Sequence, residues 1–202
     1  MQKGDFIEIS YTGKIKENGS IFDKGDVIIA LGRNMILPPL EKYLLEMNVG
    51  ERKNVNVSPE EAFGKRNENL IKTIPLSEFK KHNTNPYPGM IISADNMQGR
   101  VLSINGGRVT VDFNHPLAGK YLNYDIEIKR KIEDKEEKIR AILEYFSKSK
   151  LGKIEIKEID KKIEIIVPPI LNPLVKKLVS NEIFEIFDFD EVKFSEVFER
   201  KK

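Results

Sequence analysis

The residues of this 202-residue chain that could do chemistry are few, and their types narrow the reactions open to it. The sequence has no cysteine, which excludes disulfides, thiolate nucleophiles and cysteine-based zinc sites. It has only two histidines, His82 and His115, so a histidine-rich metal site is excluded as well. We therefore expect neither a metal nor a cofactor. The candidates that remain are apolar and aromatic side chains, with tyrosines and an aspartate among them, grouped in short motifs.

Alternating and helical patterns indicate the elements that position these motifs. Residues 6–15 alternate in polarity, which predicts a strand with one buried face. The turn residues 17–20 favour a hairpin that leads to a second strand at 27–31. Apolar residues at helical spacing over 40–47, just after two prolines, predict a helix. Residues 53–58 alternate again as a strand.

Two further parts follow along the chain. Residues 65–119 form a separate unit whose alternation predicts three short strands of a small antiparallel sheet. The strand predicted at 121–129 has no partner in that unit and would close the first sheet. We therefore expect 65–119 to be inserted into a domain formed by 1–64 and 120–131. Residues 132–202 change in character, with a charged helix followed by two strands, and predict an α+β C-terminal domain.

Several segments resemble the FKBP family of peptidyl-prolyl cis/trans isomerases, and more closely its SlyD-like branch. The motifs follow the order of the family along the chain: residues 7–13, 19–23, 29–32, 35–41, 47–51 and 58–64. The sharpest is Asn114-His115-Pro116-Leu117-Ala118-Gly119-Lys120-Tyr121-Leu122, which resembles the segment where SlyD-like chains re-enter the FKBP domain. The resemblance implies a bent antiparallel sheet wrapped on a helix, with an inserted β-rich flap domain. Long-chain archaeal members carry a C-terminal extension of about the length of 132–202.

The resemblance also implies the activity, which is cis/trans isomerisation of X–Pro bonds without covalent chemistry. The uncatalysed barrier is about 18–20 kcal/mol, and a dry apolar pocket favours the twisted, less polar amide over the planar one. The implied catalytic residues are Tyr11, Asp23, Phe63 and Tyr124. The implied substrate-binding residues are Phe22, Val27, Ile36, Leu37 and Leu40, with the Leu37 N–H bonding a substrate carbonyl.

Three of these positions depart from the residues usual in the family. Leu40 falls where many members have tryptophan, and Val27 where a larger aromatic is common, so the pocket stays apolar but becomes roomier. Phe63 replaces a tyrosine whose hydroxyl bonds the peptide in most members, a bond worth about 0.5–1.5 kcal/mol. This departure keeps an alternative open, a holdase chaperone with little or no isomerase activity. The pocket residues could also be ordinary core, and Asp23 an ordinary turn residue.

In SlyD-like proteins the inserted flap binds unfolded segments through exposed apolar surface. By that resemblance we expect residues 65–119, the flap segment, to bind client chains. The candidate residues are Phe79, Tyr87, Met90, Ile92, Met97 and Leu102. A domain of about 55 residues needs most of its apolar side chains inside, so these residues could equally form its core.

Composition limits the expected partners. Lysine and arginine number 34 against 32 acidic residues, a net charge of +2, and no basic patch interleaved with aromatics occurs, which argues against nucleic acid. No stretch approaches the roughly 20 apolar residues that span a bilayer, so we expect no membrane partner and a cytoplasmic location. Unfolded or nascent polypeptides are the expected partners. The tail at 183–198, rich in Phe and Ile, predicts either a homodimer interface within 132–202 or a second client-binding surface.

Overall fold

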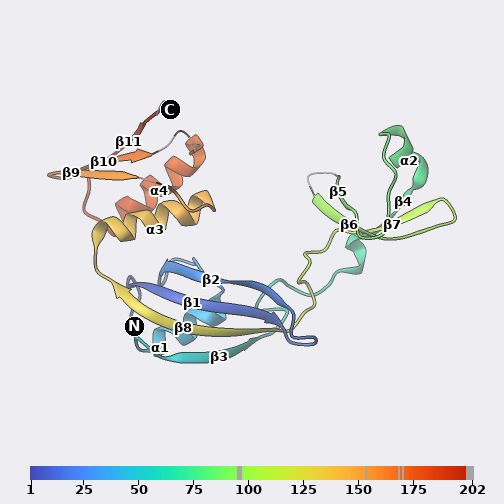
Figure 1. Ribbon diagram of the computed structural model, residues 1–202, viewed down its shortest axis with the longest axis horizontal. Helices are drawn as coiled ribbons and strands as arrows, with labels where there is room; N and C mark the ends of the chain where they lie inside the picture. The colour runs from blue at the N-terminus through green and yellow to red at the C-terminus, as the bar shows by residue number, and fades with distance from the viewer. Residues whose placement is uncertain (95–96, 153, 168, 170, 199–202) are drawn as a thin grey trace. The chain divides into compact units, whose positions relative to one another are not determined.

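The computed structural model describes residues 1–94, 97–152, 154–167, 169 and 171–198 (Figure 1). They divide into two compact units. The first comprises residues 1–14, 21–55 and 124 onward, and the second comprises 15–20 and 56–123. Helices and mainly antiparallel strands are mixed throughout, so the fold class is α+β, as the sequence predicted. None of the helices formed by the described residues is long and apolar enough to cross a membrane.

A four-stranded sheet with strand order β2-β1-β8-β3 is the base of the first unit. Its strands are β1 (Phe6–Ile15), β2 (Ile21–Ala30), β3 (Arg52–Val57) and β8 (Leu122–Ile132). Strands β1 and β2 form the expected antiparallel hairpin. Strand β2 begins at Ile21 rather than at residue 27, because its exposed first half is held by backbone pairing to β1 rather than by burial. Strand β8 lies between β1 and β3, which confirms that the chain returns to close the first sheet.

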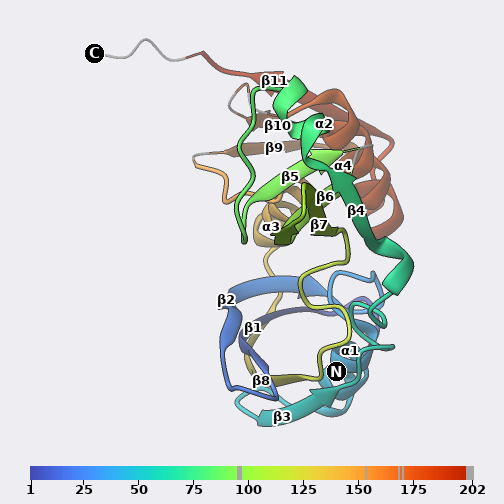
Figure 2. The same ribbon diagram turned by 90° about the vertical axis from the view of Figure 1, so that its right-hand side faces the viewer.

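Helix α1 (Pro38–Glu46) lies against one face of this sheet (Figures 1 and 2). Its first turn contains Pro38 and Pro39, where an N–H would have no partner within the helix in any case. Leu40 and Leu44, one turn apart, are fully buried, so the apolar side of the helix faces the core. The predicted helix is confirmed, with its start set by the two prolines.

The C-terminal residues add two helices and a three-stranded sheet to the same unit. The elements are α3 (Lys135–Ser147), β9 (Glu155–Ile159), β10 (Lys162–Val167), α4 (Pro173–Ile186) and β11 (Glu191–Glu196), with strand order β11-β10-β9. Strands β9 and β10 are antiparallel, whereas β10 and β11 are parallel because α4 carries the chain back between them. The charged helix and the two strands predicted in this segment are confirmed as α3, β9 and β10, whereas β11 was not predicted.

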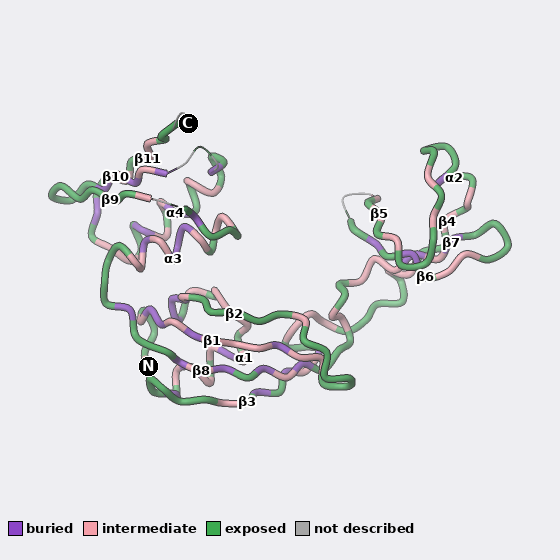
Figure 3. Tube along the Cα trace, viewed as in Figure 1, coloured by how far each residue is buried: buried purple, intermediate pink, exposed green. Residues whose placement is uncertain are grey.

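One hydrophobic cluster joins these C-terminal elements to the first sheet. Phe6 and Ala30, directly opposite each other on β1 and β2, are both 1 % exposed and belong to it. The cluster further contains Ile132, Ile139, Ile142, Leu143, Leu151, Ile163, Ile165, Val167, Leu171, Val179, Ile183 and Phe189. The purple segments of β10 and α3 in Figure 3 include members of this cluster. The apolar side chains of residues 132–198 are therefore buried partly against β1 and β2. The three-domain organisation stays a prediction.

The second unit carries its own antiparallel sheet, with strand order β4-β7-β6-β5. Its elements are a 3-10 turn (Glu68–Leu70), β4 (Ile71–Pro75), α2 (Leu76–Lys81), β5 (Ile91–Ala94), β6 (Met97–Asn105) and β7 (Arg108–Asp112). Three of the four strands were predicted. Strand β4 was missed because it is an edge strand of five residues without a buried side chain, so it carries no hydrophobic signal.

Candidate active site

A cluster of aromatic and acidic side chains forms where β1, β2 and β8 meet in the first unit. Tyr11 on β1 donates a hydrogen bond from its hydroxyl to Asp23 Oδ2 on β2 at 3.0 Å. The Phe22 ring stands edge-on to the ring of Tyr124 on β8, with centroids 5.6 Å apart and planes at 86°. The structure therefore brings together four of the predicted site residues, which come from the β1–β2 hairpin and from β8, a strand distant in sequence.

A register shift in the β1–β2 pairing explains how two consecutive residues reach this cluster. Gly13 pairs with Asp23 and Lys14 pairs with Ile21, which leaves Phe22 as an extra residue without a partner on β1. In a regular strand Phe22 and Asp23 would point to opposite faces of the sheet, whereas a bulge redirects a side chain locally. Asp23 lies on the face of Tyr11 by the normal pairing, and the bulge lets the Phe22 ring approach the same region.

Gly13 provides the space into which these rings pack. A Cβ atom built on Gly13 would lie 2.6 Å from Cζ of Phe22 and 3.0 Å from Cε1 of Tyr124. Any side chain at this position would collide with both rings. The glycine matters here for its missing side chain, because its φ angle is not in the left-handed region.

Both tyrosines of the cluster keep their protons at neutral pH. Burial raises the pKa of Tyr11 to about 12, helped by its hydrogen bond to Asp23 and by the charge of that carboxylate. Burial also raises the pKa of Tyr124 to about 12, with further contributions from the Asp23 charge and from Tyr11. Each phenol is therefore a hydrogen-bond donor in the physiological range, and Asp23 orients the donor of Tyr11.

The loop before α1 carries two of the predicted substrate-binding residues, Ile36 and Leu37, both half-buried. Leu37 caps the helix, and its carbonyl accepts hydrogen bonds from the N–H groups of Leu40 and Glu41 at 2.9 and 3.1 Å. Pro38 and Pro39 have no N–H, so the Leu37 N–H is the backbone donor at this helix start that could reach a ligand. Leu40 itself is 1 % exposed and belongs to the buried side of α1.

Val27 lies in a different setting from the other predicted wall residues. It pairs with Ile9, is 37 % exposed, and lines a hollow of about 480 Å³ together with Ala141 and Tyr145 of α3. Phe22 and Asp23 do not line this hollow. The involvement of α3 could not be read from the sequence, because residues 132–202 gave no sign of where they would pack.

Phe63 belongs to the second unit, where its ring stacks on that of His115. The ring centroids are 4.2 Å apart and the planes differ by 2°. The Nδ1 atom of His115 accepts a hydrogen bond from the Leu117 N–H at 3.2 Å, so neutral His115 carries its proton on Nε2. This bond gives His115 a structural role in its loop. The stacking was missed, and the catalytic role of Phe63 stays a prediction.

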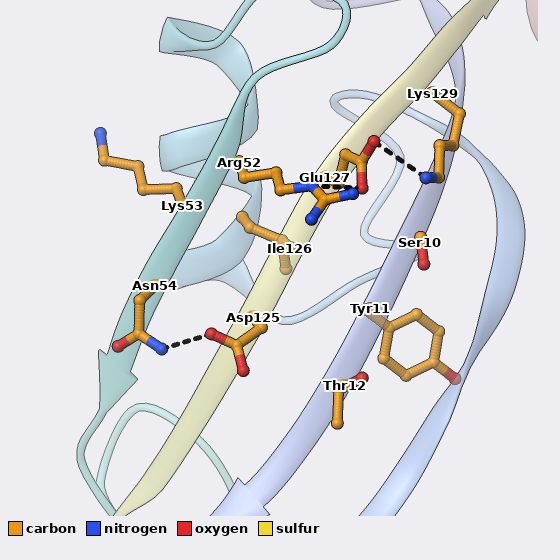
Figure 4. Close-up of a pocket in the computed structure, with 10 residues that line it drawn as sticks. All are labelled: Ser10, Tyr11, Thr12, Arg52, Lys53, Asn54, Asp125, Ile126, Glu127 and Lys129. Carbon is orange, nitrogen blue, oxygen red and sulfur yellow. Dashed lines mark hydrogen bonds and ion pairs between the residues drawn. The ribbon is translucent and has the colours of Figure 1, made fainter.

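A second hollow, of about 550 Å³, lies over the polar side chains of β1, β3 and β8 (Figure 4). Its polar side chains are largely paired: Arg52 and Lys129 bind the two oxygens of Glu127 at 2.7 and 2.8 Å, and Asn54 donates to Asp125 at 2.6 Å. Hydrogen bonds from Lys14 and Asn54 lower the pKa of Asp125, so its carboxylate stays ionised. We interpret this surface as a paired, solvated sheet face.

The six predicted client-binding residues of the flap segment separate into two groups. Phe79 is 8 % exposed and forms a core with Val101, Val109 and Val111, and Met90 and Ile92 pack against that core. Tyr87, Met97 and Leu102 are 63 %, 40 % and 41 % exposed. Only the second group presents a substantial apolar surface to solvent.

Among the described residues, no three His, Cys, Asp or Glu side chains gather in a way that could hold a metal ion.

Comparison with known proteins gives the family. Residues 1–80 match the model of the FKBP-type peptidyl-prolyl cis-trans isomerase family, and residues 72–117 match the FKBP26, IF domain model. The chain is 30 % identical over 145 residues to the short-type peptidyl-prolyl cis-trans isomerase of Methanocaldococcus jannaschii, which covers 64 % of this chain and 92 % of that protein. The chain belongs to the FKBP-type peptidyl-prolyl cis-trans isomerase family.

Two further relatives agree with this assignment. A probable FKBP-type 16 kDa peptidyl-prolyl cis-trans isomerase of Pseudomonas fluorescens is 35 % identical over 121 residues, 55 % of this chain and 79 % of the relative. The FKBP-type isomerase SlyD of Treponema pallidum is 32 % identical over 145 residues, 68 % of this chain and 81 % of the relative. The predicted enzyme class, an isomerase of peptidyl-prolyl bonds, and the predicted FKBP-type fold are thus confirmed at the level of the family.

Proposed function

We propose that this FKBP-type isomerase acts on X–Pro bonds of unfolded or nascent polypeptides in an apolar pocket, without covalent chemistry. The observation that carries the proposal is the cluster at the bulged end of the β1–β2 hairpin, where Phe22 and Tyr124 form an aromatic wall beside Tyr11 and Asp23. The strands fix the aromatic wall and the tyrosine hydroxyls, so these groups need not reorganise when the X–Pro bond of the substrate rotates.

The chemistry follows from the change in polarity of the amide. Rotation about the C–N bond breaks the amide resonance, and the twisted amide is less polar than the planar one. Phe22 and Ile36 provide apolar surface that favours this state over water, whereas Leu40 is buried in the core behind the site. The Leu37 N–H and the protonated Tyr124 hydroxyl donate hydrogen bonds to peptide carbonyls, while Tyr11 holds the Asp23 carboxylate in place.

The pocket is tested by substitution of its wall. Phe22→Ala removes an aromatic contact worth about 2 kcal/mol to the transition state, which corresponds to a roughly thirtyfold fall in kcat/KM on a short X–Pro peptide. The full chain should also accelerate the slow, proline-limited refolding phase of a model protein at substoichiometric amounts. If that phase is unchanged, the isomerase proposal is wrong, and the alternative of a holdase with little or no isomerase activity is favoured.

The exposed apolar residues of the flap segment support a second step of the proposal, the capture of unfolded chains. Tyr87, Met97 and Leu102 would hold a client, and tethering raises the effective concentration of its prolines. The triple serine variant of these residues should lose activity in the refolding assay and keep it on a short peptide. Ile159→Ser is the matched control, because Ile159 is 72 % exposed but lies in β9. Equal loss on both substrates would contradict this division of labour.

Residues 132–202 support a proposal about assembly. Leu174, Leu178 and Phe184 on α4 are 65 %, 39 % and 45 % exposed, so this helix presents three large apolar side chains to solvent. We propose that this segment forms a homodimer interface, with a second client-binding surface as the alternative. The segment also supports the proposal that the chain is a long-chain archaeal form of the family.

A further inference from the structure

The loop between β2 and α1 is held by the C-terminal helices as well as by its own neighbours. Arg33 in this loop places Nε 3.5 Å from Glu182 Oε1 and Nη1 3.8 Å from Glu185 Oε2, and its Nη2 donates to the Glu185 carbonyl at 3.3 Å. Both glutamates lie on α4. One guanidinium therefore ties the loop to a helix that is about 150 residues away in the sequence.

The next two residues of the loop are held in the same way. The Asn34 carbonyl accepts a hydrogen bond from the Tyr145 hydroxyl of α3 at 3.1 Å, and Asn34 has a left-handed φ of 55°, which asparagine tolerates better than most residues. Met35 packs against the hydrophobic cluster that α3 and α4 share with β1 and β2. Arg33 and Asn34 thus contact the C-terminal segment directly, and Met35 packs against the cluster to which that segment contributes.

Burial makes the Arg33 contact costly to break. Glu182 Oε1 is buried and has no hydrogen bond from any described residue, so the Arg33 guanidinium is the charge that compensates it. The Glu182 side chain as a whole is 20 % exposed, but loss of Arg33 would leave its buried Oε1 without the guanidinium charge, which is unfavourable. On the opposite side, the Gly32 N–H donates to Glu41 Oε1 of α1 at 2.7 Å. The loop is held from two sides immediately before Ile36 and Leu37.

We propose that Arg33 and Tyr145 are positioning residues for the isomerase reaction, through which α3 and α4 fix the loop that presents Ile36 and Leu37 to substrate. The inference rests on the proposed function, in which those two residues bind the peptide. It gives the C-terminal segment a role in catalysis itself, because a reacting geometry displaced by about 1 Å can lose as much as 100-fold in rate. A loop released from α3 and α4 would have to be ordered by each substrate.

The test uses the full chain and three variants with unequal predicted effects. Tyr145→Phe removes only the hydroxyl and keeps the ring that packs edge-on against Phe146. It should lower kcat/KM on a short X–Pro peptide about threefold. Arg33→Ala should lower it about tenfold or more, and Arg33→Lys, which keeps a charge for Glu182, should recover part of that loss. The amide signals of Ile36 and Leu37 should shift and broaden in the NMR spectrum of Arg33→Ala.

A destabilised control separates positioning from general loss of structure. Val179→Ala opens a cavity in α4 and should lower the denaturation midpoint as much as Arg33→Ala does, yet it changes neither Arg33, Tyr145 nor any residue of the loop. If Arg33 acts by positioning the loop, Val179→Ala should keep near-normal activity under conditions in which this variant is folded. Equal losses for Val179→Ala and Arg33→Ala, or unchanged activity in Arg33→Ala and Tyr145→Phe, overturn the inference.

The same peptide assay shows whether the positioning role of Arg33 and Tyr145 is wrong or the proposed pocket itself is wrong. If Phe22→Ala lowers activity and the two loop variants do not, the pocket stands and the positioning role is wrong. If Phe22→Ala has no effect while the loop variants do, the substrate is bound elsewhere, and the inference falls with the proposed function on which it rests.

Discussion

Gly13→Ala is the sharpest perturbation that the site allows, because it adds one methyl group and nothing else. The new Cβ would lie 2.6 and 2.9 Å from two ring carbons of Phe22 and 3.0 Å from the Tyr124 ring. Ordinary carbon–carbon contacts are about 3.5–4.0 Å, so the Phe22 ring must move by about 1 Å or the strand must shift. The backbone of Gly13 needs no special conformation, so the collision is the whole effect.

The magnitude follows from the crowding and from the role of the rings. Overpacking of this size costs about 1–3 kcal/mol of stability. If Phe22 and Tyr124 form the pocket wall, a displacement of about 1 Å at the reacting amide lowers kcat/KM by roughly 10- to 100-fold. A loss of stability alone hardly changes the activity of a protein that is still folded. The fall in kcat/KM of Gly13→Ala should therefore exceed what its lower stability explains.

The assay is isomerisation of a short X–Pro peptide, measured beside urea denaturation of the same samples. Gly25→Ala is the matched control, because Gly25 lies on the partner strand opposite Tyr11 and a Cβ there meets no atom within 4 Å. Gly13→Ala/Phe22→Leu should regain part of the activity by making room for the methyl group. Wild-type activity in Gly13→Ala would refute the placement of the pocket at these rings.

Three further predictions concern pH, assembly and cooperativity. The pKa values of Tyr11 and Tyr124 are raised to about 12, so their contribution to the free energy of unfolding should be constant below pH 10 and be lost between pH 10 and 12. The double variant Tyr11→Phe/Tyr124→Phe should show a smaller fall of the denaturation midpoint over this pH range. Leu174→Ser/Leu178→Ser should halve the mass found by light scattering, whereas a wild-type monomer would remove the dimer proposal. Ile142→Ala should cost about 2–5 kcal/mol and reduce amide-exchange protection in β1 as well as in α3, since both contribute to one cluster; unchanged protection of β1 would contradict this.

Elements with a local signal were predictable from the sequence. The β1–β2 hairpin follows from alternation around a glycine turn, and the start of α1 follows from Pro38-Pro39. The return of β8 to the first sheet was predictable because the alternation at 121–129 had no partner nearby. Of the site, Tyr11, Phe22, Asp23 and Tyr124 were found through their motifs, and the structure brings these four together.

Features that depend on register or on distant packing were not predictable. Strict alternation would place Phe22 and Asp23 on opposite faces, and only the shift after Gly13 redirects Phe22. The split of the flap residues into the buried Phe79 of α2 and the exposed Tyr87 and Leu102 depends on how α2, the loop after it and β6 pack in a four-stranded unit. One strand of that unit, β4, left no hydrophobic pattern at all.

The loop at 32–37 shows why residues that contact the substrate can be predicted from the sequence more easily than residues that position them. A residue that touches the peptide sits in a motif with its neighbours, so its type and spacing identify it. Arg33 and Tyr145 act through partners more than 100 residues away, and in the sequence each is an ordinary member of a charged loop or helix. Their importance follows from the buried Glu182 oxygen and from the cluster that Met35 shares with α3 and α4, which only folding creates. Because that cluster also holds Phe6 and Ala30 of the catalytic sheet, the C-terminal segment and the pocket loop are stabilised by the same buried contacts.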